Sequence, residues 1–280
     1  MKDFINIAVD AMGGENSPHK VIKGIEIHSK LSENIFYNIF GDKKIIEPII
    51  NKTNISKKAI LLNHLKDLKS LEKYIRVSTP EVFGNNEKYL LEDSEFKPST
   101  PYAVSHAAID YHLRCIGKQY EFPYCIGRFG NFYGPGQQLY RVIPKSIICF
   151  LNKKKFILDG GGKSRRSFIY SQDICSAIYK LLFESEIHKE YNFSSNEEIS
   201  IKELIERICN LLKVDFNQNV LCGDERPGKD MFYRMNCEKS YQELNWKSKV
   251  CLDDGLNITT HWIIKNLSQL KSESWTYIHR

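Results

Sequence analysis

The stretch that decides the fold reads Pro98-Ser99-Thr100-Pro101-Tyr102-Ala103-Val104-Ser105-His106. Two further blocks flank it, Val77-Ser78-Thr79-Pro80-Glu81-Val82-Phe83-Gly84 before it and Arg128-Phe129-Gly130-Asn131-Phe132-Tyr133-Gly134-Pro135 after it. Residues 73–78 and 122–127 predict buried strands, and residues 101–117 between them predict a helix. The first block therefore lies at the carboxyl end of a strand, where open α/β sheets place their ligand sites. This order predicts an α/β protein with a site at the strand ends.

In this order and at this spacing the three blocks resemble the extended short-chain dehydrogenases, the NAD-dependent nucleotide-sugar epimerases and dehydratases. The resemblance runs from residue 65 to residue 261. It implies oxidation of C4 of a nucleoside diphosphate sugar, with Tyr102 as the base and Thr79 holding the hydroxyl. It also implies that Ser78 and Tyr102 lie beside the NAD cofactor, so that the chain is expected to be an epimerase or a 4,6-dehydratase.

The catalytic tyrosine lacks the lysine that the family places four residues after it, because His106 stands there. An unperturbed phenol, with a pKa near ~10, is a poor base at neutral pH, and a nearby cation lowers that pKa. Residues four apart share one helix face, so a lysine at 106 could stand beside Tyr102. His106 is shorter and mostly neutral at pH 7. It is therefore a weak substitute in the catalytic set.

The dehydratase branch of the family carries threonine, aspartate and glutamate where this chain has Thr79-Pro80-Glu81. Removing water across C5 and C6 needs two groups, one to take the C5 proton and one to protonate the leaving hydroxyl. Only Glu81 of that pair remains. This loss favours an epimerase-like or divergent member over a standard 4,6-dehydratase.

The expected substrate contacts come from three later motifs. Residues 158–173 resemble a glycine-rich turn whose arginine reaches the nucleotide diphosphate, which implies that role for Arg166. Arg226 opens an R-P-G-x-D motif with the same implied role, and Asn131 is expected at the sugar and phosphate. Guanidinium groups offer planar donor sets that suit phosphate oxygens. Asp173 is predicted to cap the helix that follows it.

The N-terminus opens with a predicted strand, helix, strand and helix at residues 4–9, 17–31, 35–40 and 43–50. It lacks the G-x-x-G-x-x-G turn that lets the backbone approach a cofactor pyrophosphate. The run Ala8-Val9-Asp10-Ala11-Met12-Gly13-Gly14 resembles instead the start of bacterial phosphate acyltransferase, over residues 4–52. Gly13-Gly14 serves either an anion site or a tight turn. NAD binding is expected to be weak or lost.

Three parts are therefore predicted: an acyltransferase-like stub at 1–60, the C-terminal half of a Rossmann-like domain at 65–135, and a smaller α/β substrate lobe at 136–265. The Rossmann-like parallel sheet has an incomplete or substituted N-terminal half. The partition suggests a truncated fusion, from a fused or damaged gene.

Composition limits the remaining choices. The formal net charge is +6, but the lysines are scattered, which favours a solvated basic surface over a nucleic-acid site. Eight cysteines form no CxxC pair and predict reduced, buried core thiols rather than a disulfide framework or a metal site. No apolar run predicts a membrane span or signal sequence, so a cytoplasmic location is expected. A homodimer is a further candidate.

Two alternatives to a working or impaired enzyme stay open. One is a catalytically silent protein that binds a nucleotide sugar. The other is a phosphate acyltransferase fragment, which the short resemblance disfavours.

Overall fold

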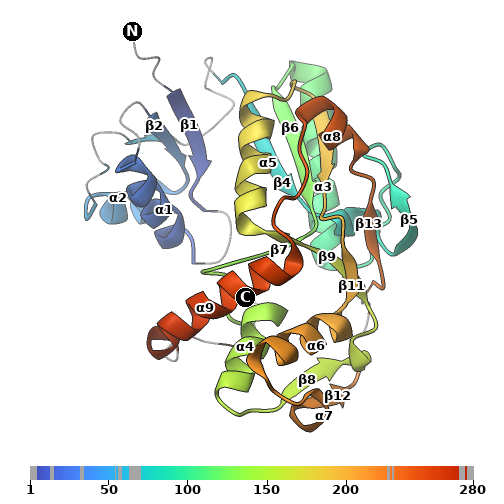
Figure 1. Cartoon of the computed structure of the whole chain (residues 1–280). Helices are drawn as coiled ribbons and strands as arrows, with labels where there is room; N and C mark the ends of the chain where they lie inside the picture. Colours follow the sequence, from blue (N-terminus) through green and yellow to red (C-terminus); the bar gives the residue numbers. More distant parts are fainter. Residues whose placement is uncertain are drawn as a thin grey trace. The chain divides into compact units, whose positions relative to one another are not determined.

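The computed structural model describes residues 5–12, 16–31, 35–53, 55, 59–62, 71–225, 228, 230–270 and 275. The chain divides into two compact units, Met1–Tyr74 and Ile75–Arg280. Helices and strands alternate in both, which confirms the predicted α/β class (Figure 1). None of the helices in the described part of the chain is long and apolar enough to cross a membrane.

The first unit is built on a parallel sheet of order β1-β2-β3, formed by β1 (Ile5–Asp10), β2 (Ile35–Phe40) and β3 (Ala59–Leu62). Its helices are α1 (His19–Ser29) and α2 (Lys43–Ile50). Ile22 with Ile25, and Ile46 with Ile50, are three or four residues apart, so each helix buries one apolar stripe in the core of this unit. The sequence predicted these elements, except for β3.

The second unit contains a sheet of order β10-β6-β4, formed by β4 (Tyr74–Ser78), β6 (Tyr124–Phe129) and β10 (Lys189–Phe193). Strands β6 and β10 are parallel. Every residue of β6 is buried, as expected for a strand covered on both faces. The helices beside this sheet are α3 (Pro101–Tyr120), α5 (Ser171–Phe183) and α8 (Glu238–Leu244). Trp246 is buried in this core against Phe193, as the sequence predicted.

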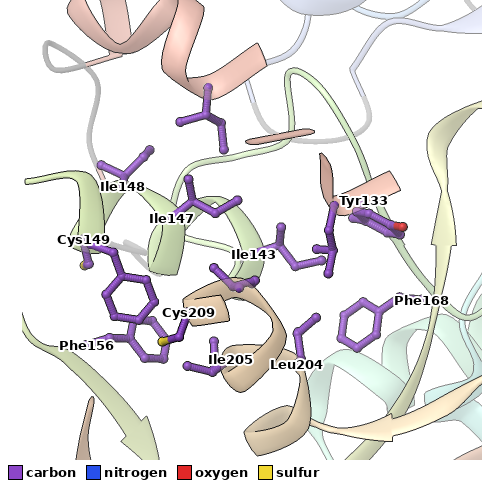
Figure 2. Close-up of a cluster of buried hydrophobic side chains, with 14 of the residues drawn as sticks. Tyr133, Ile143, Ile147, Ile148, Cys149, Phe156, Phe168, Leu204, Ile205 and Cys209 are labelled. Carbon is purple, nitrogen blue, oxygen red and sulfur yellow. The ribbon is translucent and has the colours of Figure 1, made fainter. Parts of the chain in front are cut away.

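A lobe follows, in which three helices pack on short strands: α4 (Val142–Leu151), α6 (Ile201–Leu212) and α9 (Leu252–Leu270). Its sheet has the order β11-β9-β7, from β7 (Asn131–Tyr133), β9 (Arg165–Tyr170) and β11 (Glu198–Ser200). Figure 2 shows the core, where isoleucines of α4 face Leu204 and Ile205 of α6. The smaller elements are β8 (Phe156–Asp159), the 3-10 turn η3 (Gly160–Gly162), α7 (Phe216–Asn219) and β12 (Val220–Gly223).

Two side-chain predictions are wrong. Asp173 lies in the first turn of α5 but does not cap it, because its carboxylate accepts the backbone N–H groups of Lys249 and Val250 at 3.0 Å each. Asp173 therefore ties α5 to the segment before α9. The expectation of mostly buried cysteines also fails, because Cys115, Cys175, Cys222 and Cys251 are exposed although all eight thiols are free.

Candidate active site

The carboxyl end of β4 presents two of the predicted site residues. Thr79 has an extended backbone, and its hydroxyl accepts the Glu81 N–H at 3.3 Å, which starts the 3-10 turn η2 (Pro80–Phe83). Gly84 ends this turn at a φ of +69°, where a Cβ would overlap the Lys97 carbonyl. Glycine permits both the positive φ and the close approach. The local sequence thus holds Thr79 and Glu81 at the strand end.

The first turns of α3 present the other two predicted catalytic residues, Tyr102 and His106. Thr100 caps the helix by accepting the Ala103 N–H at 3.1 Å, and Pro101 occupies the first turn, where its missing N–H costs nothing. Tyr102 then lies in the first turn, with its ring centroid 4.3 Å from that of His106. The Thr79 side chain lies near enough to Tyr102 to lower the pKa of its phenol. The structure therefore brings the predicted catalytic residues together.

The pKa of the Tyr102 phenol is raised from its ordinary value, first because of burial and second because the Glu81 carboxylate is near. Arg141 and Arg76 act in the opposite direction, since a cation stabilises the phenolate. Because 53% of the Tyr102 side chain is exposed, solvent screens all of these interactions. The Tyr102 phenol is therefore a weaker acid than an ordinary tyrosine.

Glu81 lies in a buried cluster with residues from β9 and β13 (Tyr233–Met235), which pairs with β5 (Asn86–Leu90). Burial raises the pKa of the Glu81 carboxyl, and the nearby Asp230 charge adds to this, while Arg166 opposes it. The nearby Tyr233 hydroxyl also opposes the rise and lowers the pKa of this carboxyl. A carboxyl with a raised pKa beside Tyr102 can carry a proton at higher pH than usual, which suits acid–base chemistry.

Arg166 is buried, and most of its donors are already used. Its guanidinium donates to the carbonyl oxygens of Arg165, Met231 and Asp230 at 2.7 to 3.0 Å and stacks over the Tyr233 ring at 3.9 Å. These three hydrogen bonds, to described residues, leave two of the five guanidinium N–H groups on the side of the Tyr233 ring, and we propose that a phosphate binds there. Arg166 therefore has a structural function that sequence reasoning missed, beside its predicted contact with phosphate.

The other predicted substrate residues are less defined. Arg226 lies outside the described residues. Asn131 begins β7 with an exposed side chain, so its contact with the sugar stays a prediction.

A cavity of about 390 Å³ adjoins this cluster and is bordered by Arg166 and Tyr233. Its lining also includes Arg165, Ser167 and Arg234, while Thr79, Glu81 and Tyr102 are not among its described lining residues. Side chains alternate along a strand, so Arg165 and Ser167 point away from the face of β9 that carries Arg166. The cavity thus lies mostly on the other face of β9 from Glu81, and we place the acid–base site at Tyr102 rather than in it.

Sequence reasoning missed a network of charged residues behind Tyr102. Asp110 is fully buried and accepts from Ser78, Arg76 and Arg128 at 2.8, 3.4 and 3.0 Å. Spacing offered a signal, because Asp110 follows His106 by four residues on α3 and Arg76 precedes Ser78 by two on β4. The buried Arg128 has no such local signal, because its partner Glu190 is distant in sequence.

His106 is expected to stay neutral to lower pH than an ordinary histidine. Burial lowers its pKa first, and the Arg76 guanidinium second, while Asp110 opposes both. Since protonation of His106 is disfavoured, its ring signals should titrate below the ordinary value near ~6.5. An NMR titration of the histidine ring protons, assigned with His106→Asn, measures this. A midpoint at or above the ordinary value contradicts the placement of Arg76.

The turn after β1 departs from a pyrophosphate site. The Asp10 carboxylate accepts the Met12 N–H at 2.9 Å. This backbone donor is therefore not available to a pyrophosphate, and the negative charge of Asp10 would repel one. Gly13 and Gly14 lie outside the described residues. The described residues of this turn do not fit NAD phosphates well.

Comparisons with known proteins place this site in a family. A family model described as GDP-mannose 4,6 dehydratase matches residues 47–259. The chain is 35% identical to dTDP-D-glucose 4,6-dehydratase of Mus musculus over 208 residues, which are 72% of this chain and 58% of that protein. It is 33% identical to the Homo sapiens protein of the same name, over 72% of this chain and 59% of that protein. The chain thus spans less than two thirds of the length of these curated relatives.

Solved structures show the same fold. A dTDP-glucose 4,6-dehydratase from Bacillus anthracis in complex with NAD has a TM-score of 0.76 and 23% identity, covering 94% of this chain and 98% of that chain. A UDP-glucuronic acid 4-epimerase from Bacillus cereus in complex with UDP-glucuronic acid and NAD has a TM-score of 0.73 and 18% identity, covering 93% and 99%.

The fold is that of the extended short-chain dehydrogenases, the class of NAD-dependent epimerases and dehydratases that the sequence predicted. Within that class, the chain belongs to the GDP-mannose 4,6 dehydratase family. The match begins at residue 47, so the resemblance of residues 4–52 to phosphate acyltransferase stays a prediction.

Proposed function

We propose that this chain binds a nucleoside diphosphate sugar and is an epimerase- or dehydratase-like protein with impaired NAD chemistry. The observation that carries the proposal is the meeting of Thr79, Glu81 and Tyr102 at the end of β4. Relatives named as dTDP-glucose 4,6-dehydratases and a neighbour solved with UDP-glucuronic acid support the substrate class.

In the proposed complex Thr79 and Tyr102 hold the sugar C4 hydroxyl. Glu81 then exchanges a proton with the part of the sugar next to C4. Arg166 contacts the diphosphate with its two remaining N–H groups, and Arg226 and Asn131 complete the contacts. NAD, when bound, supplies the hydride acceptor beside Ser78 and Tyr102. The residues 65–135 then form the cofactor half and 136–265 the substrate lobe.

Saturation-transfer NMR with UDP-glucose, dTDP-glucose and GDP-mannose tests the proposed substrate class. At least one of the three should bind, and binding should weaken in Glu81→Ala, which removes a side chain of the site. If none binds at millimolar concentration, the proposed function is wrong. A cytoplasmic location and a homodimer stay predictions, as does the origin of the chain as a truncated fusion.

The NAD affinity of the chain is expected to be weak or undetectable. The reason is the turn after β1, which lacks the family glycines and places the Asp10 carboxylate at a backbone donor. A calorimetric titration of the purified chain with NAD measures this affinity, and Asp10→Asn serves as a matched variant in which the repulsion is removed. A micromolar or tighter dissociation constant for the unmodified chain would overturn the expectation.

A catalytically silent binding protein is the second candidate. The observation that favours it is His106, which stands where the family has a lysine and whose pKa burial lowers, so that it does not supply a cation beside Tyr102. Binding of a nucleotide sugar without any product after long incubation with NAD distinguishes it from an enzyme.

A further inference from the structure

Two rows of side chains meet between β4 and α3. On α3, Tyr102, His106 and Asp110 are spaced by four residues and share one helix face. On β4, Arg76 and Ser78 are two residues apart and share one strand face. The Arg76 Nη2 lies 3.0 Å from the His106 Nδ1, and the His106 ring lies 4.3 Å from the Tyr102 ring. The rows form a connected path from a fixed cation to the phenol.

The path determines the state of His106. A guanidinium has N–H donors and no acceptor, so the His106 Nδ1 must accept from Arg76 and carry no proton. The proton of the neutral ring then lies on Nε2. A protonated His106 would place two cations at hydrogen-bond distance, which is unfavourable. His106 therefore cannot be the positive group near Tyr102.

We propose that Arg76, acting through neutral His106, is the positioning residue that provides the positive charge for Tyr102. This inference rests on the proposed function, because it concerns how Tyr102 is prepared for a sugar hydroxyl. Arg76 is suited to the task because its side chain is only 16% exposed and is anchored by Asp110. The Asp110 carboxylate also accepts from Arg128 and Ser78, so its negative charge is shared and does not fully neutralise Arg76.

The other groups that face Tyr102 act differently. Glu81 on η2 opposes phenolate formation. Arg141, before α4, favours the phenolate more than Arg76 does, but Arg141 is exposed, so solvent screens its charge. Thr79 is neutral and donates or accepts a hydrogen bond. Of the two cations that favour the Tyr102 phenolate, Arg76 is thus the one that is better shielded from solvent.

The path also bears on the effect of a lysine at position 106. Its ammonium would stand beside the Arg76 guanidinium in place of a neutral acceptor. We therefore expect His106→Lys alone to lower the Tyr102 pKa only slightly. The same change should lower this pKa more when it is combined with Arg76→Met, which removes the competing cation.

The test measures the Tyr102 pKa in the full chain by carbon NMR of tyrosine labelled at Cζ, with the signal assigned by Tyr102→Phe. Arg76→Met should raise this pKa, because the phenolate loses its cation, whereas Arg76→Lys should restore part of the effect. The control is Arg207→Met, an arginine on α6 that pairs with Glu197 and Asp253 away from Tyr102. A Tyr102 pKa that moves no more in Arg76→Met than in the control overturns the proposal.

A second measurement uses the unmodified protein, so it does not depend on the stability of Arg76→Met. Nitrogen NMR of labelled histidine reports the tautomer of His106, which should carry its proton on Nε2 at neutral pH. A proton on Nδ1 contradicts the proposal whether or not the variant folds. Neither measurement needs a substrate, so failure here with nucleotide sugar still bound rejects the inference and leaves the proposed function standing.

Discussion

Replacing Arg128 with methionine is expected to lower the free energy of unfolding by about 3 to 5 kcal/mol. Arg128 is completely buried on β6, and its Nη2 donates to the Asp110 and Glu190 carboxylates at 3.0 and 2.6 Å. Its guanidinium also lies against the Phe83 and Phe96 rings. Removal leaves two buried carboxylates with fewer partners, and an uncompensated buried charge is costly.

Urea unfolding of the full chain, followed by circular dichroism, measures this loss. Arg207→Met is the matched control, since its pairs are partly exposed and such pairs contribute about 0 to 1 kcal/mol. A loss for Arg128→Met no larger than that of the control would mean that the network behind β4 does not hold the site together. Asp110 also anchors Arg76 and Ser78, so we expect the Arg128 change to disturb the Tyr102 environment as well.

Truncating Arg166 or Arg226 to alanine is expected to weaken nucleotide-sugar binding about tenfold or more for each residue. A hydrogen bond to a charged group is worth roughly 1.5 to 3 kcal/mol, and about 1.4 kcal/mol corresponds to a factor of ten. The prediction for Arg166 rests on its guanidinium charge beside Glu81, where three of the five N–H groups donate to backbone carbonyls of described residues. Calorimetry with UDP-glucose and dTDP-glucose provides the measurement.

Arg166 also holds residues 230 and 231 through backbone carbonyls, so its loss has a second way to weaken binding. Uridine and thymidine, which lack phosphate, separate the two effects. A phosphate contact predicts that Arg166→Ala affects the nucleotide sugars much more than the nucleosides. Equal weakening of both would identify Arg166 as a structural anchor, and the Arg226 variant would then carry the phosphate assignment alone.

The sequence predicted the fold where local signals are strong. Thr100-Pro101 starts α3, and the spacing of Tyr102 and His106 places their rings together, because both effects act within one helical turn. The position of Thr79 at the carboxyl end of β4 was also predicted from the strand pattern before it. Strand β3 was missed because its four residues carry little periodicity of their own.

The surroundings of the site could not be predicted because they depend on contacts between residues distant in sequence. Arg76 meets His106 only after β4 and α3 pack together, and Arg166 reaches Asp230 because the segment before β13 hydrogen-bonds β9 through the Met231 carbonyl. Asp173 shows the same limit, since its position suggested a helix cap while its actual partners lie at Lys249 and Val250. Rules based on sequence position predict a hydrogen bond to the nearest helix or strand. In the folded chain the side chain bonds the groups that packing brings beside it.

The most direct test of the account is whether a nucleotide sugar binds beside Tyr102. Tyrosine labelled at Cζ gives one NMR signal per ring, and Tyr102 and Tyr233 can be assigned with their phenylalanine variants. Titration with UDP-glucose or dTDP-glucose should shift both signals saturably, and the shifts should disappear in the Arg166→Ala, Arg226→Ala double variant. Saturable binding that leaves the Tyr102 signal unchanged, or equal affinity of the double variant, would contradict a nucleotide-sugar site at the end of β4.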